Sequence, residues 1–226
     1  MHTSLNHLFD FLLPRICPGC NNKLSSSKDP VCDDCLNSII IADEERLKVE
    51  YDKDFGSSGI IKGYHSKFVF ETDKTLQQII HELKYNQKFK LGEFLGRILA
   101  EGIKTREWQL DAIIPVPIHH LKKAERGYNQ SDYIAKGLSN SLNIPYSTNT
   151  IKRVRYTESQ TGLNIDDRAS NVANAFKLKS SKKIFGKNIL IVDDVCTTGA
   201  TLLECALVFY KAGANSIYAS SIAIAA

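Results

Sequence analysis

Long apolar runs are missing from this chain of 226 residues. A membrane-spanning helix needs about 20 consecutive apolar residues, whereas the stretch from Leu8 to Ile16 is interrupted by Asp10 and Pro14. The N-terminus also lacks the basic region, the continuous apolar core and the small-residue cleavage site of a secretory signal. We therefore expect a cytoplasmic protein that does not insert into a membrane.

Several motifs of nucleotide-binding and hydrolytic proteins are absent as well. The sequence has no GxxxxGKS/T, which excludes a P-loop motor, and it has no GxGxxG, HExxH or GxSxG. Internal repeats and low-complexity tracts are also missing. What the chain does have is 43% apolar and 24% charged residues. These proportions are typical of an ordinary globular protein with a sizeable core.

Charge of one sign is not in excess over the whole chain. The net charge of +4 is too small to indicate a nucleic-acid-binding protein. The charge is unevenly distributed, however. Residues 1–50 carry 5 basic and 8 acidic side chains, whereas residues 111–180 carry 10 basic and 6 acidic ones. Any polyanionic ligand is therefore expected to contact the middle of the chain.

Four of the six cysteines form two CxxC pairs separated by eleven residues. They are Cys17, Cys20, Cys32 and Cys35. Each pair can present two thiolates from a tight knuckle, for which Gly19 would suit a left-handed turn, and two knuckles complete a tetrahedral site for Zn²⁺. Four cysteine ligands leave no open position, so the zinc would be structural. The alternatives are four small buried apolar residues or redox-active dithiols, and two pairs at this spacing disfavour both.

Strand and helix patterns alternate after residue 59. Residues 60–70, 112–116, 188–192 and 216–224 have the composition of strands, and the continuous apolar run of 188–192 is typical of a buried parallel strand. Apolar residues at helical spacing predict helices over 74–84, 91–103, a segment after 129, and about 201–211. This order predicts an α/β fold with a mainly parallel sheet flanked by helices.

A boundary between two domains is expected near residue 50. Residues 50–59 are polar and rich in Gly and Ser, which is typical of a linker. We expect residues 1–50 to form a zinc-knuckle segment and residues 51–226 to form the α/β domain.

The strand over 188–192 leads into two carboxylates and a hydroxyl-rich loop. Ligands bind at the carboxyl ends of strands in such sheets, and loop N–H groups at a helix N-terminus attract anions. Carboxylates suit sugar hydroxyls, so the segment predicts a ribose 5-phosphate site; an ordinary helix N-cap is the alternative. The candidate binding residues are Asp193, Asp194, Val195, Cys196, Thr197, Thr198, Gly199, Ala200 and Thr201.

The segment Val192–Thr201 (VDDVCTTGAT) resembles the 5-phosphoribosyl 1-pyrophosphate (PRPP) signature of type I phosphoribosyltransferases. Three further segments, together with the knuckle, resemble the ComF family of competence proteins, which includes ComFC and the GntX-like proteins. These segments are His81–Tyr85, Ile114–Pro117 and Arg126–Gln130. Scattered positions extend the resemblance over nearly the whole chain; they are Leu91, Gly92, Leu95, Gly96, Arg153, Arg155, Thr157, Gln160, Leu163, Arg168, Asn171, Ala175 and Phe176.

The resemblance implies a phosphoribosyltransferase fold with a five-stranded, mostly parallel sheet. It also implies that the acidic pair binds the ribose 2′ and 3′ hydroxyls and that the loop binds the 5′-phosphate. Mg²⁺ would bridge ribose and pyrophosphate. A role in handling single-stranded DNA during transformation is the biological context that the family implies, and any DNA-translocating helicase would be a separate chain.

Two basic stretches are candidates for holding pyrophosphate or a second substrate. The first follows Pro117, is expected to be a loop, and carries Lys122, Lys123 and Arg126. The second spans residues 152–168 and carries Arg155 and Arg168. Either stretch could instead be an ordinary solvated loop, and the second could follow a single strand of nucleic acid.

Two classes of function remain open from the sequence. In the first, the chain is an enzyme that transfers the phosphoribosyl group of PRPP. In the second, the same site serves for binding or sensing, and the protein handles incoming single-stranded DNA during transformation. The two do not exclude each other. The sequence identifies neither an acceptor nor a general base, so no catalytic residue is assigned.

Overall fold

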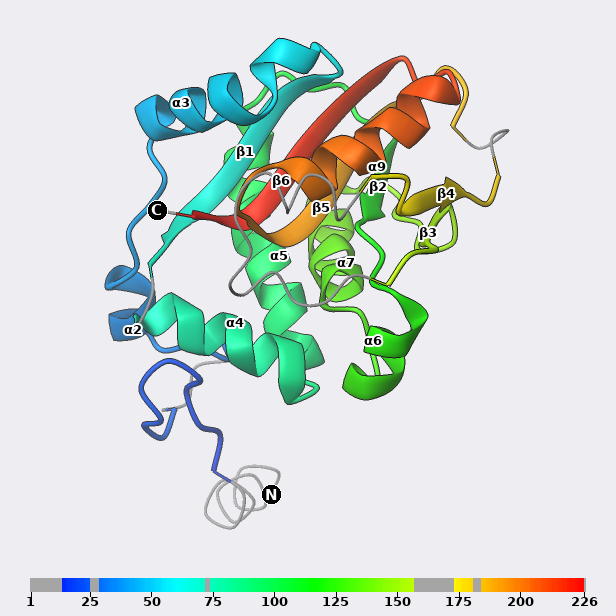
Figure 1. Cartoon of the computed structure of the whole chain (residues 1–226). Coiled ribbons are helices and arrows are strands. Elements are labelled where there is room, and N and C mark those ends of the chain that lie inside the picture. Colours follow the sequence, from blue (N-terminus) through cyan, green and yellow to red (C-terminus); the bar gives the residue numbers. More distant parts are fainter. Residues whose placement is uncertain (1–13, 25–28, 72–73, 157–172, 181–183, 226) are drawn as a thin grey trace.

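The computed structural model describes residues 14–24, 29–71, 74–156, 173–180 and 184–225. Strands and helices alternate along this part of the chain (Figure 1). In chain order the elements are α2 (Asp33–Asn37), α3 (Glu44–Asp54), the 3-10 turn η1 (Gly56–Ser58), β1 (Ile61–Phe70), α4 (Thr75–Tyr85), α5 (Phe89–Lys104), β2 (Ala112–Pro115), α6 (His120–Arg126), α7 (Gln130–Leu142), β3 (Ile151–Arg153), β4 (Phe176–Leu178), β5 (Asn188–Cys196), α9 (Ala200–Lys211) and β6 (Ser216–Ala225).

The main sheet has the strand order β1-β6-β5-β2, and every pairing in it is parallel. The four strands predicted from the sequence are therefore confirmed as one sheet. A short antiparallel pair, β3 and β4, stands apart from it. Because all four strands run the same way, their carboxyl ends meet at one edge, and Figure 1 shows α4 and α6 on that side.

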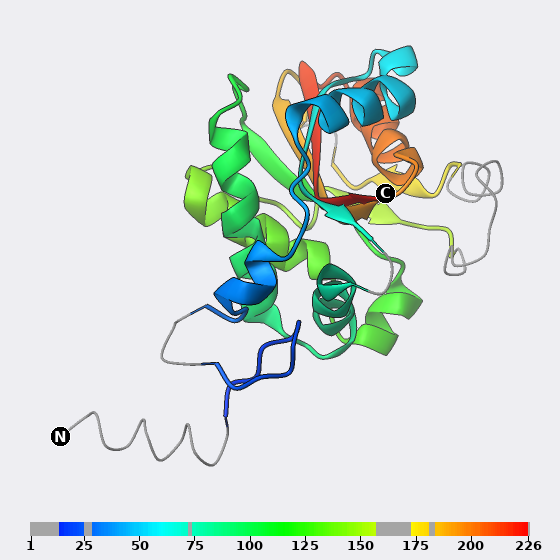
Figure 2. The same ribbon diagram turned by 90° about the vertical axis from the view of Figure 1, so that its left-hand side faces the viewer.

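Helices cover both faces of the sheet, as a continuous apolar strand requires. Side chains along β5 alternate between the faces: Leu190 and Val192 join the core under α5 and α7. Ile189 and Ile191 join the core under α3 and α9. Figure 2 shows the two helical layers on opposite sides of the sheet.

Helices α5 and α7 approach each other closely because a glycine in each helix lies against the backbone of the other. A Cβ on Gly96 would lie 2.2 Å from the carbonyl oxygen of Ile134, and a Cβ on Gly137 would lie 2.1 Å from that of Glu93. These distances are far below van der Waals contact. The close packing of α5 and α7 on this face of the sheet therefore depends on two residues without a side chain.

Three details differ from the expectations. The described part of the main sheet has four strands rather than five. On the side of β2 that faces away from β5, the described residues form one isolated bridge, between Ile113 and Tyr146, and no further strand. Pro145 precedes that bridge and has no N–H to extend a ladder. The expected loop after Pro117 contains helix α6, and the expected linker over 50–59 is the end of α3 followed by η1.

Residue 50 thus lies inside α3, which packs against the sheet through Leu47 and is followed by the buried Phe55. The polar residues that suggested a linker comprise the end of α3, where Glu50 is 8% exposed, and the Gly- and Ser-containing turn η1 that follows it. The division of the chain into residues 1–50 and 51–226 stays a prediction.

The cysteine-containing segment packs against the helical layer. Cys17, Leu24 and Val31 belong to the same apolar core as Leu76 and Leu83 of α4. Figure 2 shows this N-terminal segment and α2 next to the helices below the sheet.

No helix in the described part of the chain is long and apolar enough to cross a membrane.

Candidate functional site

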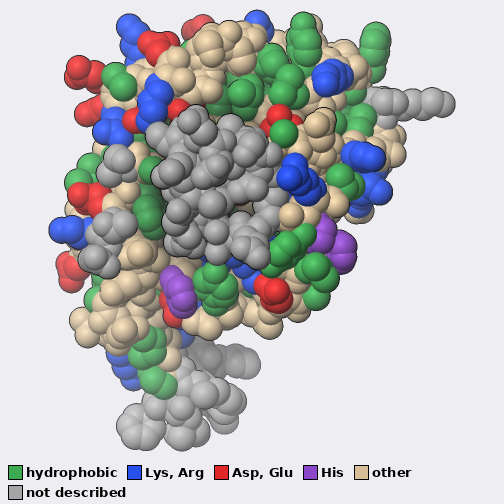
Figure 3. All heavy atoms as spheres, viewed as in Figure 1, with side chains coloured by type: hydrophobic (Ala, Val, Ile, Leu, Met, Phe, Trp, Pro, Cys, Tyr) green, Lys and Arg blue, Asp and Glu red, His purple; other side chains and the backbone are tan. Residues whose placement is uncertain are grey.

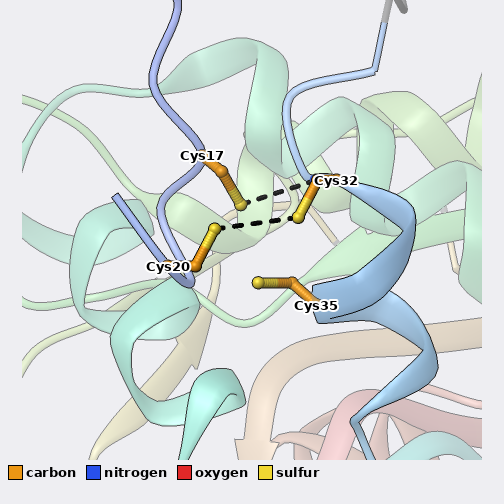
Figure 4. Close-up of side chains that lie close together, drawn as sticks. All are labelled: Cys17, Cys20, Cys32 and Cys35. Atoms are coloured by element: carbon orange, nitrogen blue, oxygen red, sulfur yellow. Dashed lines mark hydrogen bonds between the residues drawn. The ribbon is translucent and has the colours of Figure 1, made fainter. Parts of the chain in front are cut away.

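The four cysteines predicted to bind a metal lie together, with their sulfur atoms turned toward one another (Figure 4). All four sulfurs lie within 4.8 Å of one another, and Cys20 Sγ and Cys32 Sγ are 3.8 Å apart. A zinc ion with bonds of about 2.3 Å to sulfur gives a tetrahedral edge of about 3.8 Å. The donor set and the spacing therefore fit a metal ion held by four thiolates.

The electrostatics of this cluster call for a cation. Burial opposes ionisation of Cys17, but backbone N–H groups of Cys32, Gly19 and Cys20 lower its pKa to about 6. Burial raises the pKa of Cys35, and the neighbouring thiols raise it further. Four thiols this close cannot all ionise without a positive charge between them.

Gly19 is needed at the knuckle for a reason other than the one expected. The left-handed conformation is taken by Asn21, with φ 58°, and Gly19 has no positive φ. A Cβ on Gly19 would instead lie 2.8 Å from Cys35 Sγ and 2.8 Å from Thr75 Cγ2. The glycine lets the first CxxC pair pack against both the second pair and the start of α4.

The acid pair stands at the carboxyl end of β5, as predicted. Ser131 Oγ donates to Asp193 Oδ1 at 3.0 Å, and the backbone N–H of Asp194 donates to the same oxygen at 2.9 Å. Asp194 is 5% exposed. Its Oδ2 accepts from Gln130 Nε2 at 3.2 Å and lies 2.9 Å from Lys84 Nζ. Burial raises the pKa of Asp193, and the charge of Asp194 raises it further.

The loop after the acid pair has the shape of an anion cradle. Gly199 has φ 66° and is the N-cap of α9, with no side-chain hydrogen bond at the cap. The first N–H groups of the helix are therefore not taken by a capping side chain. The hydroxyl-bearing residues are Thr197, which is exposed, and Thr198 and Thr201, which are partly buried.

Behind this loop lies the end of α3, which the sequence did not link to the site. A Cβ on Gly199 would lie 2.7 Å from Phe55 Cε1 and 2.9 Å from Asp54 Cβ. Burial raises the pKa of Asp54 to about 6. Burial and the charge of Asp54 raise the pKa of Cys196 to about 12, so Cys196 is a neutral packing residue.

Cations lie near the acid pair: Lys84 pairs with Asp194, and the charge of Asp193 opposes the lowering of the Arg153 pKa by burial. Burial lowers the pKa of Lys122, and the charges of Arg153 and Arg126 lower it further, with a smaller contribution from Lys84. Arg126 Nη1 also donates to Gln130 Oε1 at 3.1 Å, which places it one residue away from Asp194. Figure 3 shows Lys and Arg side chains over β3 and β4, whereas hydrophobic and His side chains lie over α6.

The predicted basic residues lie in different places. Lys122 lies close to Arg153 and Lys84, and Arg126 lies close to Gln130. Lys123 is exposed on α6, where its charge lowers the pKa of Asp132. Arg155 is exposed and donates to the carbonyl of Ala173 at 3.4 Å. Arg168 lies outside the described residues.

Two contributors to the site were missed by the sequence analysis. Lys84 lies in the segment His81–Tyr85 that resembles the ComF family, and Ser131 belongs to no motif of the sequence. Neither has a local signal, because each contacts a carboxylate more than 60 positions away in the sequence. Lys84 does occupy the last turn of an amphipathic helix, which is an ordinary place for a solvated lysine.

Comparisons with known proteins identify the family of the chain. Residues 129–224 match the family model described as phosphoribosyl transferase domain. The chain is 32% identical over 208 residues to competence protein F of Haemophilus influenzae, a match that covers 89% of this chain and 87% of that protein. The chain belongs to the ComF family of competence proteins.

Two more similarities are weaker. The chain is 35% identical over 147 residues to the DNA utilization protein YhgH of Escherichia coli O157:H7, covering 63% of this chain and 64% of that one. A purine phosphoribosyltransferase from Pyrococcus horikoshii superimposes with a TM-score of 0.37 at 22% identity, over 57% of this chain and 70% of that one. The second likeness is too distant to support an argument. Helices α4 and α6 and the four clustered cysteines, here called the cysteine centre, all precede residues 129–224, which match the phosphoribosyl transferase domain.

Proposed function

We propose that this ComF-family protein binds PRPP together with Mg²⁺ at the acid pair, and that it handles single-stranded DNA during natural transformation. The observation that carries the proposal is the setting of Asp193 and Asp194. They stand near the carboxyl end of a parallel strand that leads into the N-terminus of α9. Asp194 pairs with Lys84, and the charge of Asp193 acts on the nearby Arg153. A ligand that joins a sugar to separate phosphate groups fits this arrangement.

Each part of the site has a task in such binding. The ribose hydroxyls would donate to the carboxylates, and the 5′-phosphate would accept from loop N–H groups and threonine hydroxyls. The pyrophosphate would face Lys122, Arg126 and Arg153. Bound Mg²⁺ would supply further positive charge to the pyrophosphate.

Binding is tested by calorimetry with PRPP and Mg²⁺. Thr198→Val keeps the shape of the side chain but removes a hydroxyl, and we expect it to weaken binding about 10-fold. Thr105→Val, at the end of α5, is the matched control. A wild-type protein that binds no PRPP would refute the proposal.

Turnover is the second candidate, because the same residues would serve an active phosphoribosyltransferase in salvage or with an amine acceptor. Release of pyrophosphate from PRPP is measured with purine and pyrimidine bases, amines and single-stranded DNA as acceptors. Release that depends on one acceptor identifies an enzyme, and binding without release identifies a binding protein.

We also propose that the metal at Cys17, Cys20, Cys32 and Cys35 is a structural Zn²⁺. The knuckle has few apolar side chains of its own, so metal binding contributes to its folding. Elemental analysis of protein produced with zinc available should find about one zinc per chain, and Cys32→Ser should abolish it. Protein without metal under these conditions would refute the assignment.

The DNA proposal is supported by the surface next to the pocket and by the names of two relatives, competence protein F and DNA utilization protein. Lys152 and Arg155 are exposed beside Tyr156, which is 41% exposed. The ammonium of Lys122 lies 5.8 Å from the centre of the Tyr156 ring. Cations that flank an exposed aromatic ring suit a single strand, whose bases stack while its phosphates pair.

Anisotropy with a labelled single-stranded oligonucleotide tests this surface. Lys152→Glu with Arg155→Glu should weaken binding by more than 10-fold and reduce its salt dependence. Lys62→Glu with Lys187→Glu, at the opposite edge of the sheet, makes the same charge change as a control. Equal losses in both double variants would show that binding is not located at this surface.

A further inference from the structure

Helix α4 brings a cation into the candidate ribose site from outside the matched domain. Its buried face holds Leu76, Ile79, Ile80 and Leu83 against the core. Lys84 follows directly on this face and reaches Asp194, with its Nζ 2.9 Å from Asp194 Oδ2. The side chain of Lys84 is 25% exposed and that of Asp194 is 7% exposed. The ammonium is thus paired with Asp194, while part of the Lys84 side chain stays exposed.

The contacts of Asp194 show how Lys84 acts within the chain itself. Asp194 Oδ1 accepts from the backbone N–H of Val195 at 2.8 Å, and Oδ2 accepts from Gln130 in addition to Lys84. The charge of Asp194 raises the pKa of Asp193, and the charge of Lys84 counteracts this effect. Lys84 therefore keeps a nearly buried negative charge in place in front of β5.

The position of Lys84 relative to the other cations points to a second task. Lys84 is close enough to Lys122 to oppose its protonation, as Arg126 and Arg153 also do. The carboxylate of Glu125 offsets part of this repulsion, and a bound anion would offset more of it. An ammonium donates three hydrogen bonds, so Lys84 can hold Asp194 and a phosphate oxygen together.

We propose that Lys84 is a PRPP-binding residue whose ammonium bridges Asp194 and the pyrophosphate group. The proposal rests on the proposed function, because it names the side chain that ties the two halves of that site together. Lys84 carries part of the neutralisation that Mg²⁺ would otherwise supply. Its loss should weaken binding of the pyrophosphate end selectively and make binding more dependent on Mg²⁺.

The test compares inorganic pyrophosphate, ribose 5-phosphate and PRPP as probes in calorimetry with the zinc-loaded full chain. Lys84→Met should weaken binding of pyrophosphate and PRPP by about 10- to 100-fold and leave binding of ribose 5-phosphate within about 3-fold. Raising Mg²⁺ should reduce the deficit, and Lys84→Arg should recover most of the affinity. Lys88→Met is the control, since Lys88 stands just before α5 and pairs with Glu82 at 2.6 Å.

The outcomes separate this proposal from the one on which it rests. If Lys84→Met binds pyrophosphate like wild type, or loses pyrophosphate and ribose 5-phosphate equally, the bridging role is wrong. If wild type binds pyrophosphate through Lys84 but binds no PRPP or ribose 5-phosphate, the proposed function is wrong and the anion contact of Lys84 stands. Unfolding temperatures of all variants show whether a loss reflects misfolding.

Discussion

Asp194 is the residue on which most of the candidate site converges. It is nearly buried, accepts from Gln130 and pairs with Lys84. Replacing a carboxylate by an amide of the same shape removes the charge and puts a donor where an acceptor is needed. Asp194→Asn should therefore weaken PRPP binding by about 1–3 kcal/mol. Calorimetry measures the loss, with the exposed Asp52→Asn as control; equal affinities would place the ribose elsewhere.

We expect His65 to make the stability of the protein depend on pH. It is 6% exposed in β1 and accepts from Arg106 Nη2 at Nδ1, 3.3 Å away. Burial and the charge of Arg106 lower its pKa to about 4, from an ordinary value of 6.5. A lowered pKa means that the folded state holds the neutral form, so its contribution is complete above pH 6.5 and is lost as the pH falls toward 4.

Urea unfolding at pH 7 and pH 5 checks this expectation. Wild type should lose about 2 kcal/mol from this group between the two values. His65→Gln should be less stable at pH 7 and should show a smaller difference between the two pH values. An unchanged pH dependence in the variant would show that other groups cause it.

At the scale of elements, the contact between α5 and α7 depends on Gly96 and Gly137. Alanine has the better helix propensity, but at these positions its Cβ would overlap a backbone carbonyl of the facing helix. Gly137→Ala should destabilise the protein by about 2 kcal/mol, because overlap in a packed core outweighs propensity. Gly56→Ala is the control, since its Cβ would meet nothing closer than 3.7 Å. Thermal unfolding that ranks the two variants the other way would contradict this packing.

At the scale of the whole molecule, α4 joins the cysteine centre to the acid pair. Its first residue, Thr75, accepts from Ser38 Oγ at 3.2 Å and lies against Gly19, while Lys84 in its last turn reaches Asp194. A helix transmits a displacement at one end to the other. Metal bound at the cysteines would therefore support the position of Lys84.

Removal of the metal should accordingly weaken PRPP binding without unfolding the sheet. We expect about a 5- to 10-fold loss of affinity after chelation, with little change in the circular dichroism of the α/β part. Returning zinc should restore binding, whereas Mg²⁺ alone should not. Affinity that is independent of zinc would show that α4 keeps its position without the knuckle.

The sequence by itself determined the features that arise from nearby residues. The apolar run of β5, the helical spacing of α5 and α7, the paired cysteines and the acidic pair with its loop were all predicted and are found where expected. Strand and helix periodicity, cysteine spacing and glycine in a tight turn are local properties. The resemblance to the ComF family was equally a property of the sequence.

Only the tertiary structure decided which distant residues complete these local features. It brought Lys84 to Asp194, Ser131 to Asp193 and Phe55 to Gly199. It also turned a stretch that looked like a linker into helix α3 on the sheet. These contacts depend on the order of strands and on helix packing, because an ammonium, a hydroxyl or a polar helix face is satisfied equally well by water until the fold places a partner beside it.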